Sequence, residues 1–338
     1  MNDWRIYRGA GLPHDEIRRL PAPPPWRDFS AGGADDTLAG SDRRLGVRRR
    51  LVQNHHPRPA ETDAVNAALY LRRPLLVTGN PGTGKSTLAH AVAHELGLGR
   101  VLRWPIVSRT TLQDGLYRYD AIGRLQDVQL ERARPDSTGS AAATPAGIGS
   151  YIRLGPLGTA LLPSEQPRVL LIDELDKSDL DLPNDLLNAL EEGEFAIPEL
   201  ERIADREPVV EVLSDDGRKV RIPGGRVRCT TFPFIVLTSN GERDFPAALL
   251  RRCIRLELEP PGEEQLGAMI EAHLGAGAAT GEGERDLVRR FLDREPGEVI
   301  ATDQLLNALY LTQHASRAER VTRERIADML MQPLDQPR

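Results

Sequence analysis

The sequence predicts an α/β fold: a three-layer αβα core around a parallel β-sheet, followed by a small all-helical domain. Largely apolar runs at residues 75–78, 169–172 and 234–237 are typical of strands buried on both faces, as in parallel sheets. The first run leads through a glycine-rich loop into an amphipathic helix at 87–96, which is the order of an α/β nucleotide-binding unit. After the two prolines at 260–261 the pattern becomes helical, which indicates a second domain.

The N-terminal region has the composition of an extended arm. Residues 1–45 are rich in Pro, Gly, Asp and Arg, so no packed domain is expected there. The aromatic residues that would dock this arm are Trp4, Tyr7, Trp26 and Phe29. Residues 46–73 indicate helical structure, most clearly at 63–72.

Between the predicted core strands the chain carries further elements. Residues 101–107 indicate a second strand. An insertion is expected at 126–153, flexible over 134–149 because Ser, Ala, Gly and Pro dominate there. The strand-like runs 209–213 and 219–222 flank Asp-Asp-Gly, so a hairpin is expected at 209–222.

The C-terminal part predicts helices only. Four segments have helical patterns: 263–274, 284–292, 303–313 and 322–331. We therefore expect an arm at 1–45, an α/β core at 46–259 and a helical lid at 260–338.

Composition limits the class of protein. The chain has 338 residues, 40% hydrophobic and 28% charged, which is typical of a globular protein, and no apolar run is long enough to span a membrane. The N-terminus lacks the apolar stretch of a secretory signal, and two scattered cysteines favour a reducing cytoplasm. A net charge of −6 argues against a nucleic-acid-binding surface. For the local basic cluster of Arg43, Arg44 and Arg48 to Arg50, we favour a solvated stretch over a nucleic-acid contact.

Residues 79–86, Gly-Asn-Pro-Gly-Thr-Gly-Lys-Ser, fit the phosphate-binding pattern G-x-x-x-x-G-K-[ST]. Glycines allow backbone N–H groups to approach phosphates, and the following helix adds a favourable dipole. Lys85, one of only three lysines, would neutralise β- and γ-phosphate charge, and the Ser86 hydroxyl would hold Mg²⁺. The residues expected to bind the nucleotide are Asn80, Pro81, Gly82, Thr83, Gly84, Lys85, Ser86 and Thr87.

Polar residues follow two later strands. Asp173 and Glu174 end the apolar run 169–172, at the edge where ligands bind in parallel sheets. Asp173 would orient Mg²⁺ through water, and Glu174 would orient and polarise the attacking water. Asn240, after the run 234–237, can reach the γ-phosphate, although its neighbours also fit a turn.

Two adjacent arginines, Arg251 and Arg252, follow a short apolar helix. Arginine is always charged and binds phosphate through two donors, so one of them can reach the γ-phosphate bound to a neighbouring subunit. A surface ion pair is the alternative role for either residue.

These motifs, in this order, resemble the AAA+ ATPases, and within them the MoxR-like group. The resemblance rests on the loop 79–86, LLIDEL at 170–175, LTSN at 237–240 and LLRRC at 249–253. Three further stretches are similar to MoxR-type sequences: 108–125, 154–162 and 176–194. The similarity extends over roughly residues 46 to 335.

The resemblance implies a ring homo-oligomer, a hexamer in most relatives, with ATP and Mg²⁺ at the subunit boundary. Asp173 and Glu174 match the family's second acidic motif, and Asn240 matches sensor one. Arg252 best matches the arginine that acts in trans, with Arg251 as the alternative. Segments 108–125, 126–153 and 209–222 would face a pore or a partner. Leu116, Tyr117 and Tyr119 are the apolar pore candidates, but core packing is the favoured alternative for them.

One feature departs from the family. Relatives often carry a basic sensor-two residue at the start of the lid helix that matches 301–309, where this chain has no basic residue at 298–302. The nearest is Arg294. Either Arg294 or a partner supplies this charge, or the lid senses nucleotide weakly.

The resemblance implies an ATPase that remodels or matures a client protein, with Lys85, Glu174, Asn240 and Arg252 or Arg251 as the catalytic residues. Relatives commonly work beside proteins with von Willebrand factor A domains, and some serve bacterial conflict systems. Two alternatives stay open: a nucleic-acid-directed motor, and a nucleotide-gated scaffold with little turnover.

Overall fold

The computed structural model describes residues 5–20, 57–133, 147–275, 281–293, 301–314, 325, 327 and 329–332. Several residues considered above lie outside these ranges, and so does most of the expected arm. They are Trp4, Trp26, Phe29, the basic cluster between Arg43 and Arg50, and Arg294.

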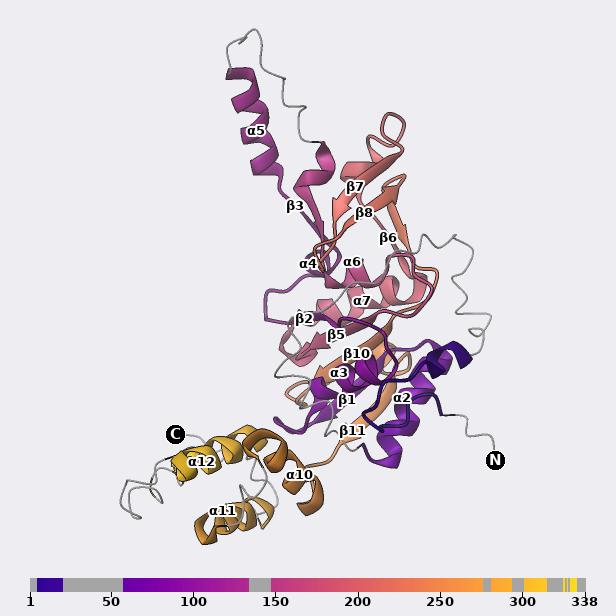
Figure 1. Cartoon of the computed structure of the whole chain (residues 1–338). Helices are drawn as coiled ribbons and strands as arrows, with labels where there is room; N and C mark the ends of the chain where they lie inside the picture. The colour runs from indigo at the N-terminus through magenta and orange to yellow at the C-terminus, as the bar shows by residue number, and fades with distance from the viewer. Residues whose placement is uncertain are drawn as a thin grey trace.

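A five-stranded parallel sheet forms the centre of the molecule (Figure 1). Its strands lie in the order β11 (Ile254–Leu258), β1 (Leu75–Gly79), β10 (Phe234–Ser239), β5 (Val169–Asp173) and β2 (Leu102–Pro105). Each neighbouring pair is parallel. The predicted parallel sheet is confirmed, including the strands expected from the three apolar runs.

Helices cover both faces of this sheet. Successive side chains of each strand point to opposite faces, so the apolar strands present a surface on both sides that helices can bury. Leu75, Val77 and Leu171 pack with α2 (Pro59–Leu71) and α3 (Lys85–Glu95) in one buried cluster. Leu76 and Leu170 pack on the other side in a second cluster, formed with four helices: α4 (Leu112–Leu116), α6 (Pro156–Ala160), α7 (Asp181–Glu192) and α9 (Ala247–Leu250). The two clusters confirm the three-layer arrangement.

Two small sheets lie beyond the second helical layer. One has the order β3 (Tyr117–Tyr119), β4 (Ile152–Leu154), β7 (Val209–Leu213), β8 (Lys219–Pro223). The other pairs β6 (Glu194–Ala196) with β9 (Arg226–Arg228), and α8 (Pro198–Glu201) follows β6. Strands β7 and β8 are antiparallel neighbours, so the predicted hairpin is correct.

The structure describes both ends of the predicted insertion at 126–153, and only the expected flexibility at its last part needs correction. Its first part belongs to a regular helix, α5 (Ala121–Ala133), which projects away from the sheet (Figure 1). Its last part contains a 3₁₀ turn, η3 (Ile148–Tyr151), and Ile148 is buried in the core. Composition suggested flexibility up to residue 149, but a single apolar side chain that fills a core position is enough to order the backbone around it. Residues 134–146 lie outside the described ranges.

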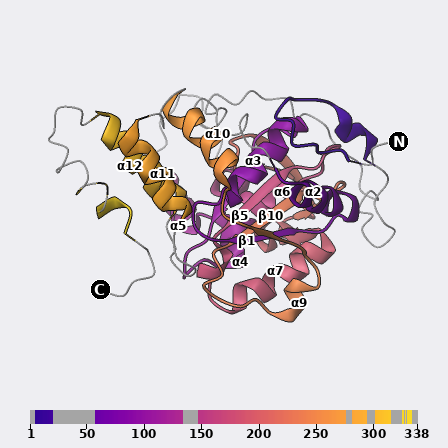
Figure 2. The same cartoon turned by 90° about the horizontal axis from the view of Figure 1, so that it is seen from below.

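The C-terminal helices pack on one another beside the core (Figure 2). They are α10 (Glu263–Leu274), α11 (Glu282–Leu292) and α12 (Thr302–His314), and Leu266, Phe291 and Leu305 lie in their shared buried cluster. Of the fourth expected helix, at 322–331, the described residues 325, 327, 329 and 330 are helical, and residue 331 lies in a turn.

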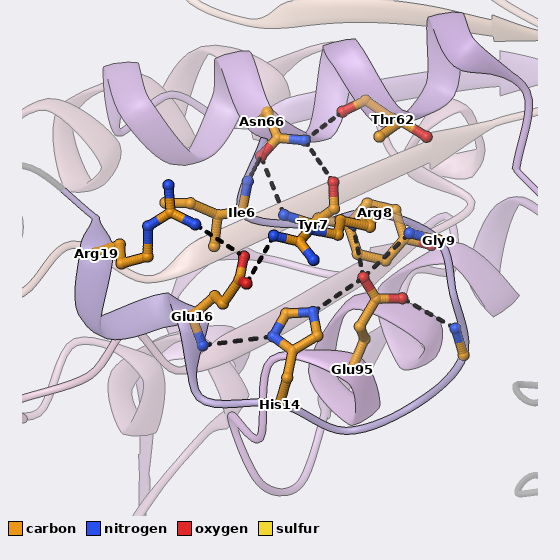
Figure 3. A network of polar contacts seen from close by, with 11 residues as sticks. Ile6, Tyr7, Arg8, Gly9, His14, Glu16, Arg19, Thr62, Asn66 and Glu95 are labelled. Atoms are coloured by element: carbon orange, nitrogen blue, oxygen red, sulfur yellow. Dashed lines mark hydrogen bonds and ion pairs between the residues drawn. The ribbon is translucent and has the colours of Figure 1, made fainter. Parts of the chain in front are cut away.

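The N-terminal segment, residues 5–20, packs against α2 and α3 (Figure 3). Tyr7 is 1% exposed and Ile17, in the 3₁₀ turn η1 (Glu16–Arg19), is also buried. The side chain of Asn66 on α2 binds the backbone of this segment. Its Oδ1 accepts from the N–H groups of Ile6 (2.7 Å) and Tyr7 (3.1 Å), and its Nδ2 donates to the carbonyl of Tyr7 (2.8 Å).

Glu95, the last residue of α3, holds the same segment from the other side. Its carboxylate accepts from the backbone N–H groups of Arg8 (2.6 Å), Gly9 (3.0 Å) and Gly11 (3.1 Å), and lies 3.3 Å from His14 Nε2. The Glu95 side chain is 1% exposed, so these contacts replace water around a buried charge. Because α3 begins at the phosphate loop, residues 5–20 are anchored to the opposite end of the helix that carries this loop.

We predict that Asn66→Ala destabilises the protein by about 2–4 kcal/mol, because it leaves buried backbone groups of Ile6 and Tyr7 without partners. Denaturant unfolding measures this loss. The matched control is Asp63→Ala on the same helix, which removes a half-exposed ion pair with Arg5 and should cost less than about 1 kcal/mol. Equal losses in the two variants would contradict the importance of the Asn66 contacts.

Candidate functional site

The loop between β1 and α3 has the backbone that a phosphate-binding loop requires. Gly79 (φ 145°) and Gly82 (φ 79°) adopt positive φ, which side chains disfavour. A Cβ on Gly79 would lie 2.4 Å from the carbonyl oxygen of Leu258 on β11. Glycine is therefore needed there both for its conformation and for the close approach of the neighbouring strand.

Lys85, the first residue of α3, lies folded back along this loop. Its Nζ donates to the carbonyl oxygens of Gly79 (2.6 Å) and Asn80 (2.8 Å). Burial lowers the pKa of Lys85, and the nearby carboxylates of Asp176, Asp173 and Glu174 partly offset this effect. The ammonium group therefore lies at the phosphate loop, facing a cluster of negative charge.

Asp173, at the end of β5, is the most connected carboxylate of the site. Its Oδ1 accepts from the hydroxyls of Ser86 (2.7 Å) and Thr238 (2.8 Å), and its Oδ2 accepts from Arg103 Nη2 (2.6 Å). Burial alone would raise the pKa of Asp173, but these hydrogen bonds outweigh it and hold the pKa below its usual range. The expected magnesium residues, Ser86 and Asp173, are thus in direct contact.

Glu174 follows in a left-handed conformation (φ 63°, ψ 49°), which is unusual for a residue with a side chain. Its N–H donates to the Thr238 hydroxyl (2.9 Å), which holds this backbone in place. Its carboxylate is 45% exposed and pairs with Lys177 Nζ at 2.9 Å. Strained backbone of this kind concentrates at functional sites, which makes Glu174 a candidate functional residue.

Asn240 lies just beyond β10 and is held by the buried carboxylate of Asp176, which follows the neighbouring strand β5. Its N–H donates to Asp176 Oδ2 (2.8 Å), which also accepts from the N–H of Glu242 (3.1 Å). Asp176 is 2% exposed, and its Oδ1 has no hydrogen-bond partner among the described residues. The structure therefore brings Lys85, Ser86, Asp173, Glu174 and Asn240 to one edge of the sheet.

The two arginines after α9 differ in their surroundings. Arg252 pairs through Nε with Glu191 on α7, and its Nη1 donates to the carbonyl of Ala248 (3.1 Å). Arg251 is exposed, and no side-chain partner for it is found in the described part of the chain. Among the described residues, neither arginine contacts the phosphate loop of its own chain.

The start of α12 lies directly over the phosphate loop. A Cβ on Gly82 would be 2.6 Å from the backbone nitrogen of Thr302. The sensor-two position is thus close to the loop, and its described residues Ala301 and Thr302 are both buried. Arg294, the basic alternative, lies outside the described residues.

Two of the three apolar pore candidates, Leu116 and Tyr117, are buried, and Tyr119 is partly buried against the same core cluster. Leu116 is 9% and Tyr117 5% exposed. Tyr117 stacks with Phe195 at 6.4 Å between ring centroids, and its hydroxyl donates to Glu199 (2.8 Å). Burial and this contact raise the pKa of Tyr117 to about 12. These contacts are those of core residues, in line with the favoured alternative.

Sequence reasoning missed four residues of this site: Arg103, Asp176, Lys177 and Thr238. Asp176 and Thr238 lie inside the stretches that carry the family resemblance, so the sequence marked both positions as candidates. It did not indicate which residues they contact. Lys177 is three residues from Glu174, a spacing that allows an ion pair in a helical turn. Arg103 offered no signal, because it lies in a different predicted strand from its partner.

Comparison with known families gives one match. The model of the AAA domain (dynein-related subfamily) matches residues 74–253, which begin just before β1 and end just before β11. No curated protein matches the chain. Among the described residues, no helix is long and apolar enough to cross a membrane.

We predict that Gly82→Ala destabilises the protein more than Gly97→Ala. Both glycines have positive φ, so each substitution carries a backbone strain of about 1–2 kcal/mol. Only at Gly82 does the new methyl group also meet the backbone of α12, whereas at Gly97 nothing lies within 4 Å. Denaturant unfolding without nucleotide measures both losses, and equal values would argue against contact between the loop and α12.

Proposed function

Because the chain belongs to the AAA domain family, in its dynein-related subfamily, we propose that it uses ATP hydrolysis to remodel or mature a partner protein. The family match covers more than half of the chain and identifies it as a P-loop ATPase. AAA domains in general use ATP and Mg²⁺, and this subfamily includes the MoxR-like ATPases. Membership in the MoxR-like group is part of the proposal.

The residues at the sheet edge fit magnesium. A hydroxyl (Ser86) and a carboxylate (Asp173) lie in contact beside the phosphate loop, and both are oxygen ligands of the kind that Mg²⁺ takes together with phosphates and water. Magnesium, when bound, would neutralise charge on the β- and γ-phosphates. Ser86 and Asp173 would hold it, and residues 80–87 would bind the nucleotide.

The remaining residues supply the hydrolytic chemistry. Lys85 would leave the carbonyls of Gly79 and Asn80 for the phosphate oxygens. Glu174, whose carboxylate is 45% exposed, would orient the attacking water and accept its proton. Asn240, fixed through its N–H, would hold the water or the γ-phosphate from the next strand.

The described contacts of Arg251 and Arg252 do not include the phosphate loop of their own chain, which supports a ring of identical subunits, a hexamer by family resemblance. Arg251 and Arg252 would complete the site of a neighbour. Arg252 is the better match by position, yet it would have to leave Glu191, whereas Arg251 is exposed and has no described partner. An arginine supplied in trans stabilises negative charge in the transition state for phosphoryl transfer.

The observation that carries the choice of a protein client is the surface of α5. Ile122 (72%), Leu125 (59%) and Leu130 (65%) are strongly exposed on this projecting helix. Exposed apolar side chains favour contact with protein over contact with phosphate backbones. The neighbouring hairpin β7–β8 carries charges of both signs, including Glu211 paired with Lys219. A protein with a von Willebrand A domain, in a bacterial conflict system, is the client class that the family resemblance offers.

We also propose a division of labour along the chain. Residues 46–259 would form the ATPase core, and residues 260–338 would act as a lid that closes over the nucleotide. The contact between Gly82 and the start of α12 supports such a lid. Residues 1–45 would form an arm whose described part, residues 5–20, docks on the core.

A mixing experiment tests the shared site. Glu174→Gln should lower turnover by at least about 100-fold while ATP still binds, because the water loses its base. Arg251→Ala/Arg252→Ala should lower it by about 10³-fold, because the transition state loses its arginine. Mixed rings should recover ATPase activity at interfaces that combine an intact Glu174 with a neighbour's intact arginines. The two single arginine variants then show which residue acts, and no recovery with intact assembly would contradict a contribution in trans.

Stimulation of ATPase activity tests the client class. We expect single- and double-stranded DNA and RNA to leave the ATPase rate unchanged. The rate is measured at several salt concentrations, because binding to a phosphate backbone weakens as salt rises and is detected most easily at low salt. A protein partner encoded beside this chain should raise the rate. Many-fold stimulation by nucleic acid without any effect of protein partners would instead support a nucleic-acid motor.

A further inference from the structure

Arg103 on β2 occupies the one oxygen of Asp173 that the surrounding hydroxyls leave free. Ser86 and Thr238 both donate to Oδ1, while Arg103 donates to Oδ2 from Nη2 (2.6 Å) and Nε (3.2 Å). Asp173 is only 6% exposed. Its carboxylate is therefore fully paired, and a further partner on Oδ2 has to replace Arg103.

Magnesium needs this same oxygen in the proposed site. The Ser86 hydroxyl can ligate a metal through its oxygen and still donate its proton to Asp173 Oδ1, so that bond does not have to break. Oδ2 is then the oxygen left for the metal or for water bound to it. A guanidinium stays protonated and has no acceptor atom. Arg103 therefore remains a cation and competes with Mg²⁺ for Asp173 Oδ2.

We propose that Arg103 acts as a cation that holds Asp173 in the nucleotide-free protein and is displaced from Oδ2 when the magnesium nucleotide enters. This inference rests on the proposed function, because it takes Asp173 as a magnesium residue. The burial of the two partners makes the exchange feasible. The Asp173 side chain is 8% exposed and must always face a cation or donors, whereas the Arg103 side chain is 48% exposed and can turn into water.

The exchange makes Arg103 a positioning residue that sets how much magnesium the site requires. In competition with Mg²⁺ for Oδ2, the guanidinium raises the magnesium concentration needed for nucleotide binding. Without magnesium the same guanidinium would stay on Asp173, beside Ser86 of the phosphate loop, and its positive charge would favour binding of the metal-free nucleotide. Loss of Arg103 should therefore change the two affinities in opposite directions, whereas a purely structural role would weaken both.

The experiment measures binding of mant-ATP by fluorescence to the full chain carrying Glu174→Gln, which removes turnover. Binding is titrated with Mg²⁺ and, separately, measured in EDTA. Arg103→Gln should lower the half-saturating Mg²⁺ concentration by about three- to tenfold, the effect of losing one partly exposed ion pair, and should weaken binding in EDTA. Arg103→Lys, which keeps the charge but not the forked contact, should give a smaller shift in the same direction.

Arg118→Gln is the matched control. Arg118 is 77% exposed and pairs with Asp114 at 3.5 Å, away from Asp173, so this variant should bind as the parent does. An unchanged or raised half-saturating Mg²⁺ in Arg103→Gln, at an unchanged unfolding midpoint, would overturn the inference. If Arg103→Gln does not fold, Arg103→Lys decides in the same way. If the parent fails to bind mant-ATP at any magnesium concentration, the proposed function is overturned as well.

Discussion

The buried carboxylate of Asp173 is the group on which the arrangement of the site depends. Hydrogen bonds reach it from α3 through Ser86, from β10 through Thr238 and from β2 through Arg103. An ionised carboxylate removed from water is stable only when donors or cations surround it. All three segments must therefore be in register with β5 for the core to pack, and this requirement fixes the start of α3 and the phosphate loop against the sheet.

The same group explains why the residues that we propose for hydrolysis lie so close together. Thr238 donates to Asp173 and accepts from the N–H of Glu174, so one hydroxyl holds both the carboxylate and the unusual backbone of the next residue. Two residues after Thr238, just beyond the end of β10, the N–H of Asn240 is held by Asp176. Strands β5 and β10 thus exchange contacts in both directions, and the polar ends of both strands form one unit.

The sequence predicted best those features that depend on one continuous segment of the chain. Apolar runs such as Val169–Ile172 predict strands buried on both faces, because apolar layers lie on both sides of such strands. The glycine-rich loop matches a phosphate-binding pattern within one short segment. Contacts between distant segments leave no such pattern. Arg103 meets Asp173 across 70 residues, and nothing beside Arg103 in the sequence distinguishes it from a surface arginine. Glu95 likewise looks like an ordinary solvated helix charge, yet it is buried, because its partners are backbone N–H groups of residues 8–11, which any sequence would supply.

The anchoring of residues 5–20 has a consequence for the order in which the chain matures during synthesis. These residues are synthesised well before their partners: Asn66 lies 60 residues after Ile6, and Glu95 lies 87 residues after Arg8. The N-terminal segment can dock only after α2 and α3 have been made and have packed together. Until then Tyr7 and Ile17, which are buried in the finished protein, remain in water. Residues 5–20 thus reach their final place only after α2 and α3, which are synthesised later, and their docking requires that the helix after the phosphate loop is complete.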